Sequence, residues 1–290
     1  YIIILVFFSI IFNQYYGYIG ILPIDSFLVF NSGYDLMSGY YPFKDYWTIK
    51  EPFIDLIQAI FFKIFGVSWF SYVLHASLFN CLITISTFFI LKRFKLNKNL
   101  CFFYSLCVAI LTYPTAGTPF SDHHTLILCL LSFYTFILAI YENNNFYWFI
   151  TPILLGFALM SKQAPTIYII FIISLISIIY FFKTRDISNM IYSILGFLFV
   201  SISFFVLLFL AEINVQDFFY QFFLYPKSLG GTRFDWLSPF EFNRIILRYK
   251  LQYLSISILI YIIFKFYAKR IKINFADYLI IFGVIFFCIL

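Results

Sequence analysis

The chain is a succession of apolar runs, and most of them approach the ~20 residues that a helix needs to cross a bilayer. Of its 290 residues, 63% are hydrophobic and only 11% are charged, and the mean hydropathy is +0.95. A soluble fold of this composition would lack a polar surface. Because lone strands leave their backbone groups unpaired in lipid, the runs are predicted to form an all-α, polytopic transmembrane helical bundle.

About nine spans are predicted, since runs of roughly 15 to 22 residues are read as single crossings. They cover residues 1–21, 68–91, 100–114, 124–141, 146–161, 164–182, 189–210, 251–267 and 275–290. Residues 1–290 are taken as one transmembrane domain. The chain begins with Tyr1 and stops inside an apolar run, so we expect a fragment that lacks part of both ends, and the span number is a minimum.

The charges between the spans predict the topology. If the chain is divided into two spans at Lys162, one side of the membrane carries ten basic and three acidic residues. Most of them lie in the short connectors 92–99, 141–145, 182–188 and 265–274. By the positive-inside rule this side is cytoplasmic. If the break were only a kink, the orientation of all later spans would invert. Because the basic residues are scattered between spans and form no solvated face, a nucleic-acid partner is not expected.

The other face carries outer loops at 22–67, 115–123 and 211–250. Loops of about 40 residues exceed what a connection requires and are commonly functional. Within the first loop, apolar residues of 53–65 surround Asp55, Gln58 and Lys63, which predicts an interfacial helix that lies on the membrane.

Two parts of the first outer loop carry candidate functional residues. Asp25, in LPIDSF, is either a general base at the membrane surface or the N-cap of a short helix. The stretch PFKDYWTIKEPF holds Lys44, Asp45, Lys50 and Glu51 within eight positions. These charges are either substrate-binding groups or part of an aromatic belt with snorkelling lysines.

The later outer segments add further candidates. Asp122 and His123, in SDHHT, can contribute to a divalent metal site, although neighbours in a helix point about 100° apart and a helix cap is the alternative. Lys162, followed by Gln163, is a cation between two apolar spans, which marks either a lipid-phosphate site or a snorkelling side chain. Arg233 lies in the mixed-charge loop 211–250, which is either a substrate loop or solvated surface.

Two segments together resemble a known superfamily. LPID followed by the pattern GxxPFxDYWxxKxPxxxxxQAxFFKxFG, and the span that ends GFALMSKQAP, cover residues 23–70 and 146–170. They resemble membrane glycosyltransferases of the GT-C superfamily, particularly the group akin to protein O-mannosyltransferases and lipid A aminoarabinose transferases. The chain departs from that group at Ser26, where many relatives have a second acid, and at Glu51-Pro52, where a proline pair is common.

The resemblance implies that Asp25 is the catalytic residue and that the donor is a polyprenyl-phosphate-linked sugar. The acceptor would be a lipid, a glycan or a protein. Independently of the resemblance, their charge and position make Asp45, Lys50, Glu51, Lys162, Gln163 and Arg233 candidates for substrate binding, and Asp122 with His123 candidates for a metal site. We expect such an enzyme in the bacterial inner membrane, with its site on the extracytoplasmic face. The alternatives are a transporter or flippase of lipid-linked sugars, and a polysaccharide polymerase or ligase.

Overall fold

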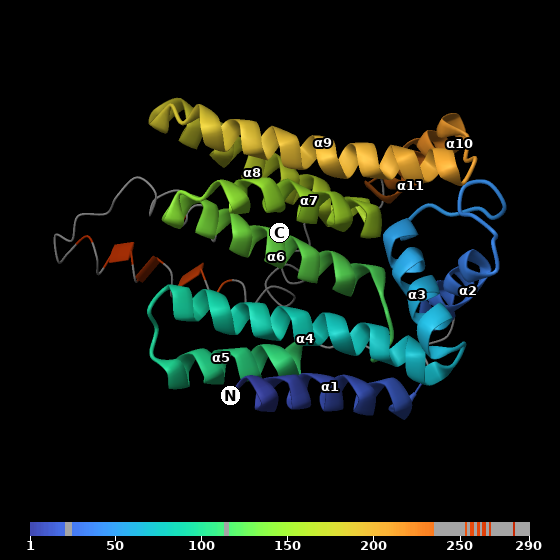
Figure 1. Ribbon diagram of the computed structural model, residues 1–290, viewed down its shortest axis with the longest axis horizontal. Coiled ribbons are helices and arrows are strands. Elements are labelled where there is room, and N and C mark those ends of the chain that lie inside the picture. The colour runs from blue at the N-terminus through green and yellow to red at the C-terminus, as the bar shows by residue number, and fades with distance from the viewer. Residues whose placement is uncertain are drawn as a thin grey trace.

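The computed structural model describes residues 1–20, 25–112 and 116–234, together with scattered positions between 253 and 281. These residues form a helical bundle (Figure 1), and the described part contains no β-strand beyond a single bridge between Pro42 and Tyr46. The helices are α1 (Ile2–Ile19), α2 (Asp25–Met37), α3 (Pro52–Phe65), α4 (Trp69–Arg93), α5 (Lys98–Leu111), α6 (Ser121–Glu142), α7 (Asn145–Ser161), α8 (Gln163–Thr184), α9 (Ile187–Leu210), α10 (Val215–Phe219) and α11 (Tyr225–Phe234). A π-helical turn, Tyr220–Leu224, joins the last two.

The helices confirm the predicted fold class. Each of the first seven predicted spans corresponds to one helix, with ends that differ by a few residues. Five of these helices, α1, α4, α6, α8 and α9, are long and apolar enough to cross a membrane, whereas α5 and α7 are shorter apolar helices of 14 and 17 residues. The predicted spans 251–267 and 275–290 lie outside the continuously described residues, so a total of nine is not confirmed.

The connections separate to the two ends of the bundle as the charge pattern predicts. The α4–α5, α6–α7 and α8–α9 connections lie together at one end, whereas α2 and α3 lie at the other (Figure 1). Contacts support this grouping, because Arg93 Nη1 lies 3.0 Å from Glu142 Oε1 and Asn189 Nδ2 donates to Asn143 Oδ1 at 2.6 Å. Which end faces the cytoplasm stays a prediction.

The predicted break at Lys162 is present. This residue has extended backbone angles and separates α7 from α8. The Tyr180 hydroxyl, late in α8, donates to the Asn143 side chain just before α7 begins, at 3.1 Å. The end of α8 therefore lies beside the start of α7, so the two helices form a hairpin.

Helix α3 exists as predicted, but two of its three polar residues do not face water. Asp55 and Gln58 are buried, and α2 packs across them. Gly33 of α2 allows this approach, because a Cβ atom there would lie 2.6 Å from Cγ of Gln58. Asp55 and Gln58 thus point into the protein whereas Lys63 is exposed, and the placement of α3 at the membrane surface stays a prediction.

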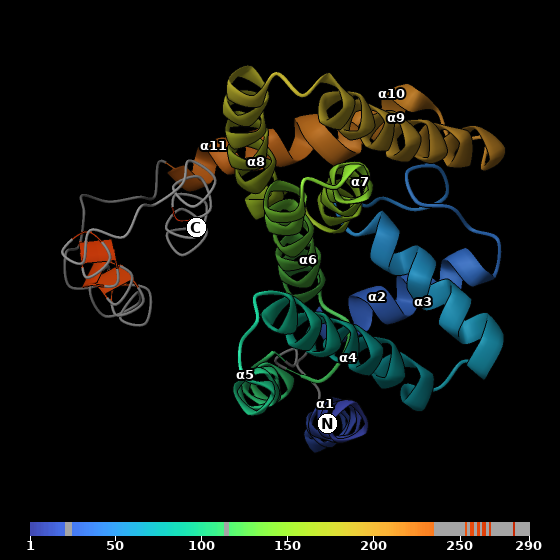
Figure 2. The same ribbon diagram turned by 60° about the vertical axis from the view of Figure 1, so that its left-hand side comes forward.

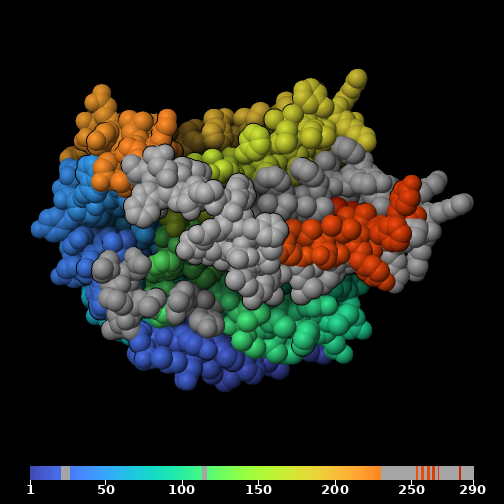
Figure 3. Space-filling view, turned by 180° about the vertical axis from the view of Figure 1, so that it is seen from behind, coloured from blue at the N-terminus to red at the C-terminus, as the bar shows by residue number. Residues whose placement is uncertain are grey.

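The bundle packs in two groups of helices that meet at α4 and α6. In Figure 2, α1, α4 and α5 lie together on one side and α7, α8 and α9 on the other. A large apolar cluster around Trp148, Phe136 and Tyr180 joins α6, α7 and α8. Figure 3 shows the opposite face, with the blue N-terminal helix along one edge and the yellow and orange helices along the other. Helices α2 and α3 lie at one end of the bundle (Figure 1), where one polar and one apolar cavity are found.

Candidate functional site

A polar cavity of about 480 Å³ lies between α2, the 46–51 segment, the first turn of α3 and α11. Four charged or acidic side chains and four aromatic or amide-bearing ones are among its lining residues: Asp35, Lys50, Glu51, Asp55, Tyr46, Trp47, Tyr225 and Asn31. Lys50 and Glu51 are predicted substrate-binding residues, and both are present here. The cavity is therefore the strongest candidate site in the described part of the chain.

Glu51 is held in an unusual backbone conformation. Its φ and ψ are 76° and 13°, the left-handed region that a non-glycine residue adopts at a cost of order 1–3 kcal/mol. It immediately precedes Pro52, which opens α3 and disfavours the right-handed helical region for the residue before it. The Glu51 side chain is 3% exposed, and its Oε1 lies 2.9 Å from Lys50 Nζ. Its second oxygen, Oε2, is buried without a hydrogen-bond partner in the described chain.

Asp55 forms the deepest part of the cavity lining. It is 1% exposed, and its Oδ1 accepts a hydrogen bond from the Ser32 hydroxyl at 2.5 Å. Burial raises the pKa of the Asp55 carboxyl well above its usual range; the Ser32 hydrogen bond and the Lys50 charge oppose this shift, and the charges of Glu51 and Asp35 add to it. The carboxyl is thus held toward its neutral, proton-donating form.

Two further polar groups complete the lining. Asp35 is partly buried, and its carboxylate has no hydrogen-bond or ion-pair partner among the residues that the structure describes. The Tyr46 hydroxyl is buried near Asp55 but lacks a hydrogen bond of normal geometry. Burial, followed by the charges of Asp55 and Asp35, raises the pKa of Tyr46, so this phenol stays protonated. The cavity therefore combines carboxylate acceptors with hydroxyl donors.

Two glutamines hold the 41–51 segment in place. Gln163 Nε2 donates to the carbonyls of Ile49 and Phe222, at 2.8 Å each. Gln221 donates to the Phe43 carbonyl at 3.1 Å and accepts from the Thr48 amide at 3.2 Å. Gln163, predicted to bind substrate, here positions the loop that carries Lys50 and Glu51, and it is absent from the cavity lining.

Asp45 also acts on the loop. Its Oδ2 accepts a hydrogen bond from the Tyr41 amide at 2.7 Å, which closes the turn that contains both residues. Asp45 is exposed and does not line the polar cavity. A substrate-binding role for Asp45 therefore stays a prediction.

Lys162 and Asp122 meet at the same end of the bundle, where Lys162 Nζ forms an ion pair with Asp122 Oδ1. Asp122 is half exposed, and the lysine is 29% exposed. His123 contacts the Thr112 carbonyl through Nε2. Residues 1–20, 25–112 and 116–234 contain no group of three or more His, Cys, Asp or Glu residues that could hold a metal ion. The metal hypothesis for Asp122 and His123 thus has no additional ligand among these residues.

Sequence reasoning gave no role to a buried histidine pair beside the site. His75 of α4 and His124 of α6 are fully buried, and their Nε2 atoms lie 3.1 Å apart. His75 Nδ1 lies 2.8 Å from Gln58 Oε1, and His124 Nδ1 lies 3.0 Å from the Phe120 carbonyl. This hydrogen-bonded row ties α3, α4 and α6 together beneath the cavity.

Asp25 and Arg233 are placed only through their helices. Asp25 is the first residue of α2, three and seven positions before Leu28 and Ser32, which line the polar cavity. Positions separated by three and seven residues share one helical face. Arg233 follows Leu229, another lining residue, by four positions in α11. The side chains of Asp25 and Arg233 lie outside the described part of the structure.

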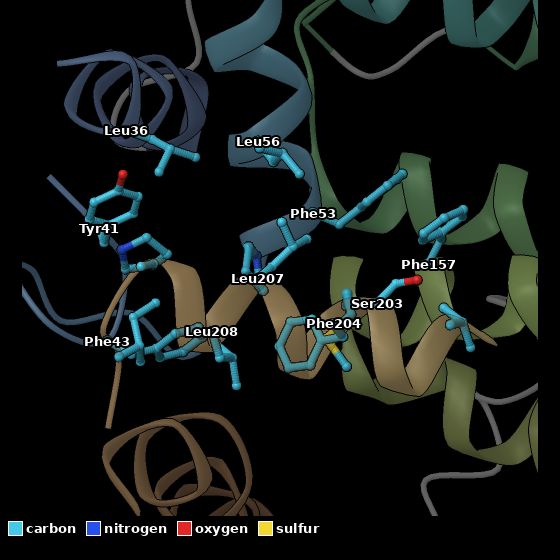
Figure 4. A pocket seen from close by; sticks show the side chains of 16 residues that line it. Leu36, Tyr41, Phe43, Phe53, Leu56, Phe157, Ser203, Phe204, Leu207 and Leu208 are labelled. Carbon is cyan, nitrogen blue, oxygen red and sulfur yellow. The ribbon is translucent and has the colours of Figure 1, made fainter. Parts of the chain in front are cut away.

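An apolar cavity of about 320 Å³ lies next to the polar one (Figure 4). Its walls come from α2, α3, α7 and α9, and side chains including Leu36, Phe53, Phe157, Phe204 and Leu207 surround it. Asp35 lines the polar cavity while Leu36 lines the apolar one, and Glu51 and Pro52 divide in the same way. The two cavities therefore lie on opposite sides of α2 and of the start of α3.

Two lining residues, Asp35 and Asp55, were not identified as site residues from the sequence. Asp55 had a usable signal, because it shares a helical face with Ala59 and Phe62, and a charged residue on an apolar face is unusual. Asp35 follows Ser32 by one turn, but only the packing of α2 against α3 brings both residues to one cavity. That packing cannot be read from a single sequence.

A family model described as dolichyl-phosphate-mannose-protein mannosyltransferase matches residues 50–219. The matched range includes Lys50, Glu51, Lys162 and Gln163, whereas Asp25 and Asp35 precede it. No curated protein and no solved structure matches the chain.

Proposed function

Because the chain belongs to the dolichyl-phosphate-mannose-protein mannosyltransferase family, a family of GT-C membrane glycosyltransferases, we propose that it transfers a sugar from a polyprenyl-phosphate donor to a hydroxyl of a lipid, glycan or protein. The reaction takes place at the end of the bundle that holds both cavities. The positive connectors lie at the opposite end, which supports an extracytoplasmic site. In a bacterium the enzyme would lie in the inner membrane.

The observation that supports this donor is that a polar and an apolar cavity are adjacent, separated only by α2 and the start of α3. A polyprenyl-phosphate sugar has a hydroxyl-rich head and a hydrocarbon tail. The head fits the cavity with Asp35, Glu51 and Asp55, and the tail fits the cavity with Phe53 and Phe204. Burying hydrocarbon in the second cavity contributes about 25 cal/mol for each Å² removed from water.

The chemistry requires a base and at least one cation. In the proposed step Asp25 takes the proton of the acceptor hydroxyl as its oxygen bonds to the anomeric carbon. The bond between that carbon and the phosphate oxygen breaks, and the lipid phosphate leaves with the bonding electron pair. Lys162 lies at this end of the bundle and stabilises the developing phosphate charge. It is paired with Asp122 and exchanges that partner for phosphate.

A transfer assay tests this proposal. Full-length protein in lipid nanodiscs is incubated with a radiolabelled polyprenyl-phosphate mannose and a crude acceptor fraction, and we expect labelled acceptor to accumulate. Asp25→Asn keeps the shape of the side chain but removes the base, so the rate should fall by about 10²- to 10⁴-fold.

Asp217→Asn is the matched control, because Asp217 is exposed on α10 and lines neither cavity. Its rate should equal that of the wild type. Near-normal transfer by Asp25→Asn would return Asp25 to the role of a helix cap.

A further inference from the structure

The polar cavity holds more carboxyl groups than ammonium groups. Three carboxyl groups, those of Asp35, Glu51 and Asp55, line it with a single ammonium group, that of Lys50. That ammonium group is already paired with Glu51 Oε1 at 2.9 Å. Around Asp35 and Glu51, the part of the cavity that remains for a ligand is therefore hydrogen-bond accepting.

Two of these acceptors have no partner in the described chain. Glu51 is 2% exposed, and its buried Oε2 makes no hydrogen bond. Asp35 also lacks a hydrogen-bond or ion-pair partner among the described residues, and it lines the same cavity. A buried acceptor without a donor is costly, so the Glu51 oxygen indicates that a ligand supplies a donor here, and Asp35 offers that ligand a second, partly buried acceptor.

The ligand must then present hydrogen-bond donors to these oxygens. Sugar hydroxyls and amino groups do so, whereas a carboxylate or a phosphate offers only further acceptors. An anionic group placed beside Asp35 and Glu51 would also meet like charge in a partly desolvated site. The cavity is therefore unsuited to the phosphate of the donor and suited to its sugar.

We propose that this cavity selects the sugar by charge, with Asp35 as the specificity-determining residue. It accepts a sugar that carries hydroxyl or amino groups and rejects one that carries a carboxylate. This inference rests on the proposed function, since it assigns the sugar part of the donor to this cavity. Glu51 supplies a second acceptor. The left-handed backbone conformation of Glu51 sets the direction in which its side chain leaves the backbone.

The test compares three methyl glycosides that differ only at C6: a hexoside, a 6-amino hexoside and a hexuronoside. Binding to the full chain in nanodiscs is measured by saturation-transfer NMR, which requires neither the lipid donor nor turnover. The hexoside and the amino hexoside should bind, and the hexuronoside should bind at least about tenfold more weakly because like charges repel at a binding site. Asp35→Asn should reduce this discrimination severalfold.

Two variants separate charge from shape. Asp35→Glu keeps the charge and should retain most of the discrimination, and Asp217→Asn, whose residue lies outside both cavities, should leave it unchanged. Equal binding of hexuronoside and hexoside by the wild type would overturn the proposal. So would the absence of any glycoside binding, or an Asp35→Asn variant with unchanged selectivity. Selective glycoside binding without transfer from a polyprenyl donor would instead refute the proposed function alone.

Discussion

The polar and apolar cavities share one stretch of chain but differ completely in chemistry. Asp35 and Glu51 face one of them, and their neighbours Leu36 and Pro52 face the other. On α2 the division follows from helix geometry, because consecutive side chains point about 100° apart. At Glu51 it accompanies a left-handed backbone at the start of α3. A change of one position in the sequence is thus enough to move a side chain from the polar cavity to the apolar cavity.

The comparison also shows why the loop needs many anchors. Part of the lining of each cavity comes from the 41–51 segment, which is not a helix. Gln163 and Gln221 hold that segment through its carbonyls and one amide. Loss of either glutamine would therefore disturb both cavities together.

The largest effect on donor binding is expected at Lys162, which lines neither cavity but lies at the same end of the bundle. If it holds the donor phosphate between sugar and tail, Lys162→Met removes the cation and keeps the apolar stem. Truncating one partner of a buried charge pair costs about 2–5 kcal/mol, which is at least about 30-fold in donor dissociation constant. Titration of the purified protein with a polyprenyl-phosphate sugar measures this change.

Asp122 provides the control for Lys162, because the two side chains form an ion pair. Asp122→Asn frees the lysine, so donor affinity should stay the same or rise. The free energy of unfolding should change by no more than about 1 kcal/mol in either variant, since partly exposed ion pairs contribute little. Equal dissociation constants for Lys162→Met and wild type would assign the lysine to simple snorkelling.

A smaller effect is expected from filling the apolar cavity. Leu207 lines it from α9 (Figure 4), and Leu207→Trp places a larger side chain there. If the tail of the donor occupies this space, KM should rise by about tenfold for a long-chain donor, which corresponds to about 1.4 kcal/mol. KM for a donor with only two isoprene units should change little, because its tail is too short to depend on the whole cavity.

Leu210→Trp is the matched control for that substitution. Leu210 lies three residues further along α9, is 70% exposed and does not line the cavity. Its KM should match that of the wild type for both donors. If Leu207→Trp and Leu210→Trp shift KM equally, the apolar cavity is not the site of the tail.

The sequence predicted the features that depend on local composition. The first seven predicted spans are helices, because an apolar run of this length must form a helix to pair its backbone groups in lipid. The break at Lys162 and the clustering of basic connectors followed from charge counting. Lys50 and Glu51 were found because charges are rare in this chain, so any cluster of them indicates a site.

The remaining site residues depend on tertiary packing. Asp55 becomes buried only because α2 lies across α3 at Gly33. Substrate binding by Gln163 stays a prediction, and its contact with Ile49 joins residues 114 positions apart, which no local pattern indicates. The helix predicted at 53–65 is present. The burial of Asp55 and Gln58 could not be predicted, because it depends on how α2 packs against α3.

The smallest effect is a dependence of stability on pH that originates in the polar cavity. Asp55 has a raised pKa in the folded protein, mainly through burial. Between its unfolded pKa of about 3.9 and the higher folded value, the folded state holds a proton that the unfolded state has released. Its contribution to the free energy of unfolding is therefore greatest at low pH and falls by up to about 1.4 kcal/mol per pH unit as pH rises through that window.

Asp55→Asn removes the titrating proton, so its thermal midpoint should depend less on pH than that of the wild type. The measurement is the difference between the two midpoints in detergent from pH 4 to pH 8, in which contributions from other titrating groups cancel. Asp217→Asn, an exposed acid outside the cavities, should follow the wild type across this range. Parallel curves for wild type and Asp55→Asn would mean that the Asp55 carboxyl is ionised in the fold, and the polar cavity would then carry one more negative charge than its burial indicates.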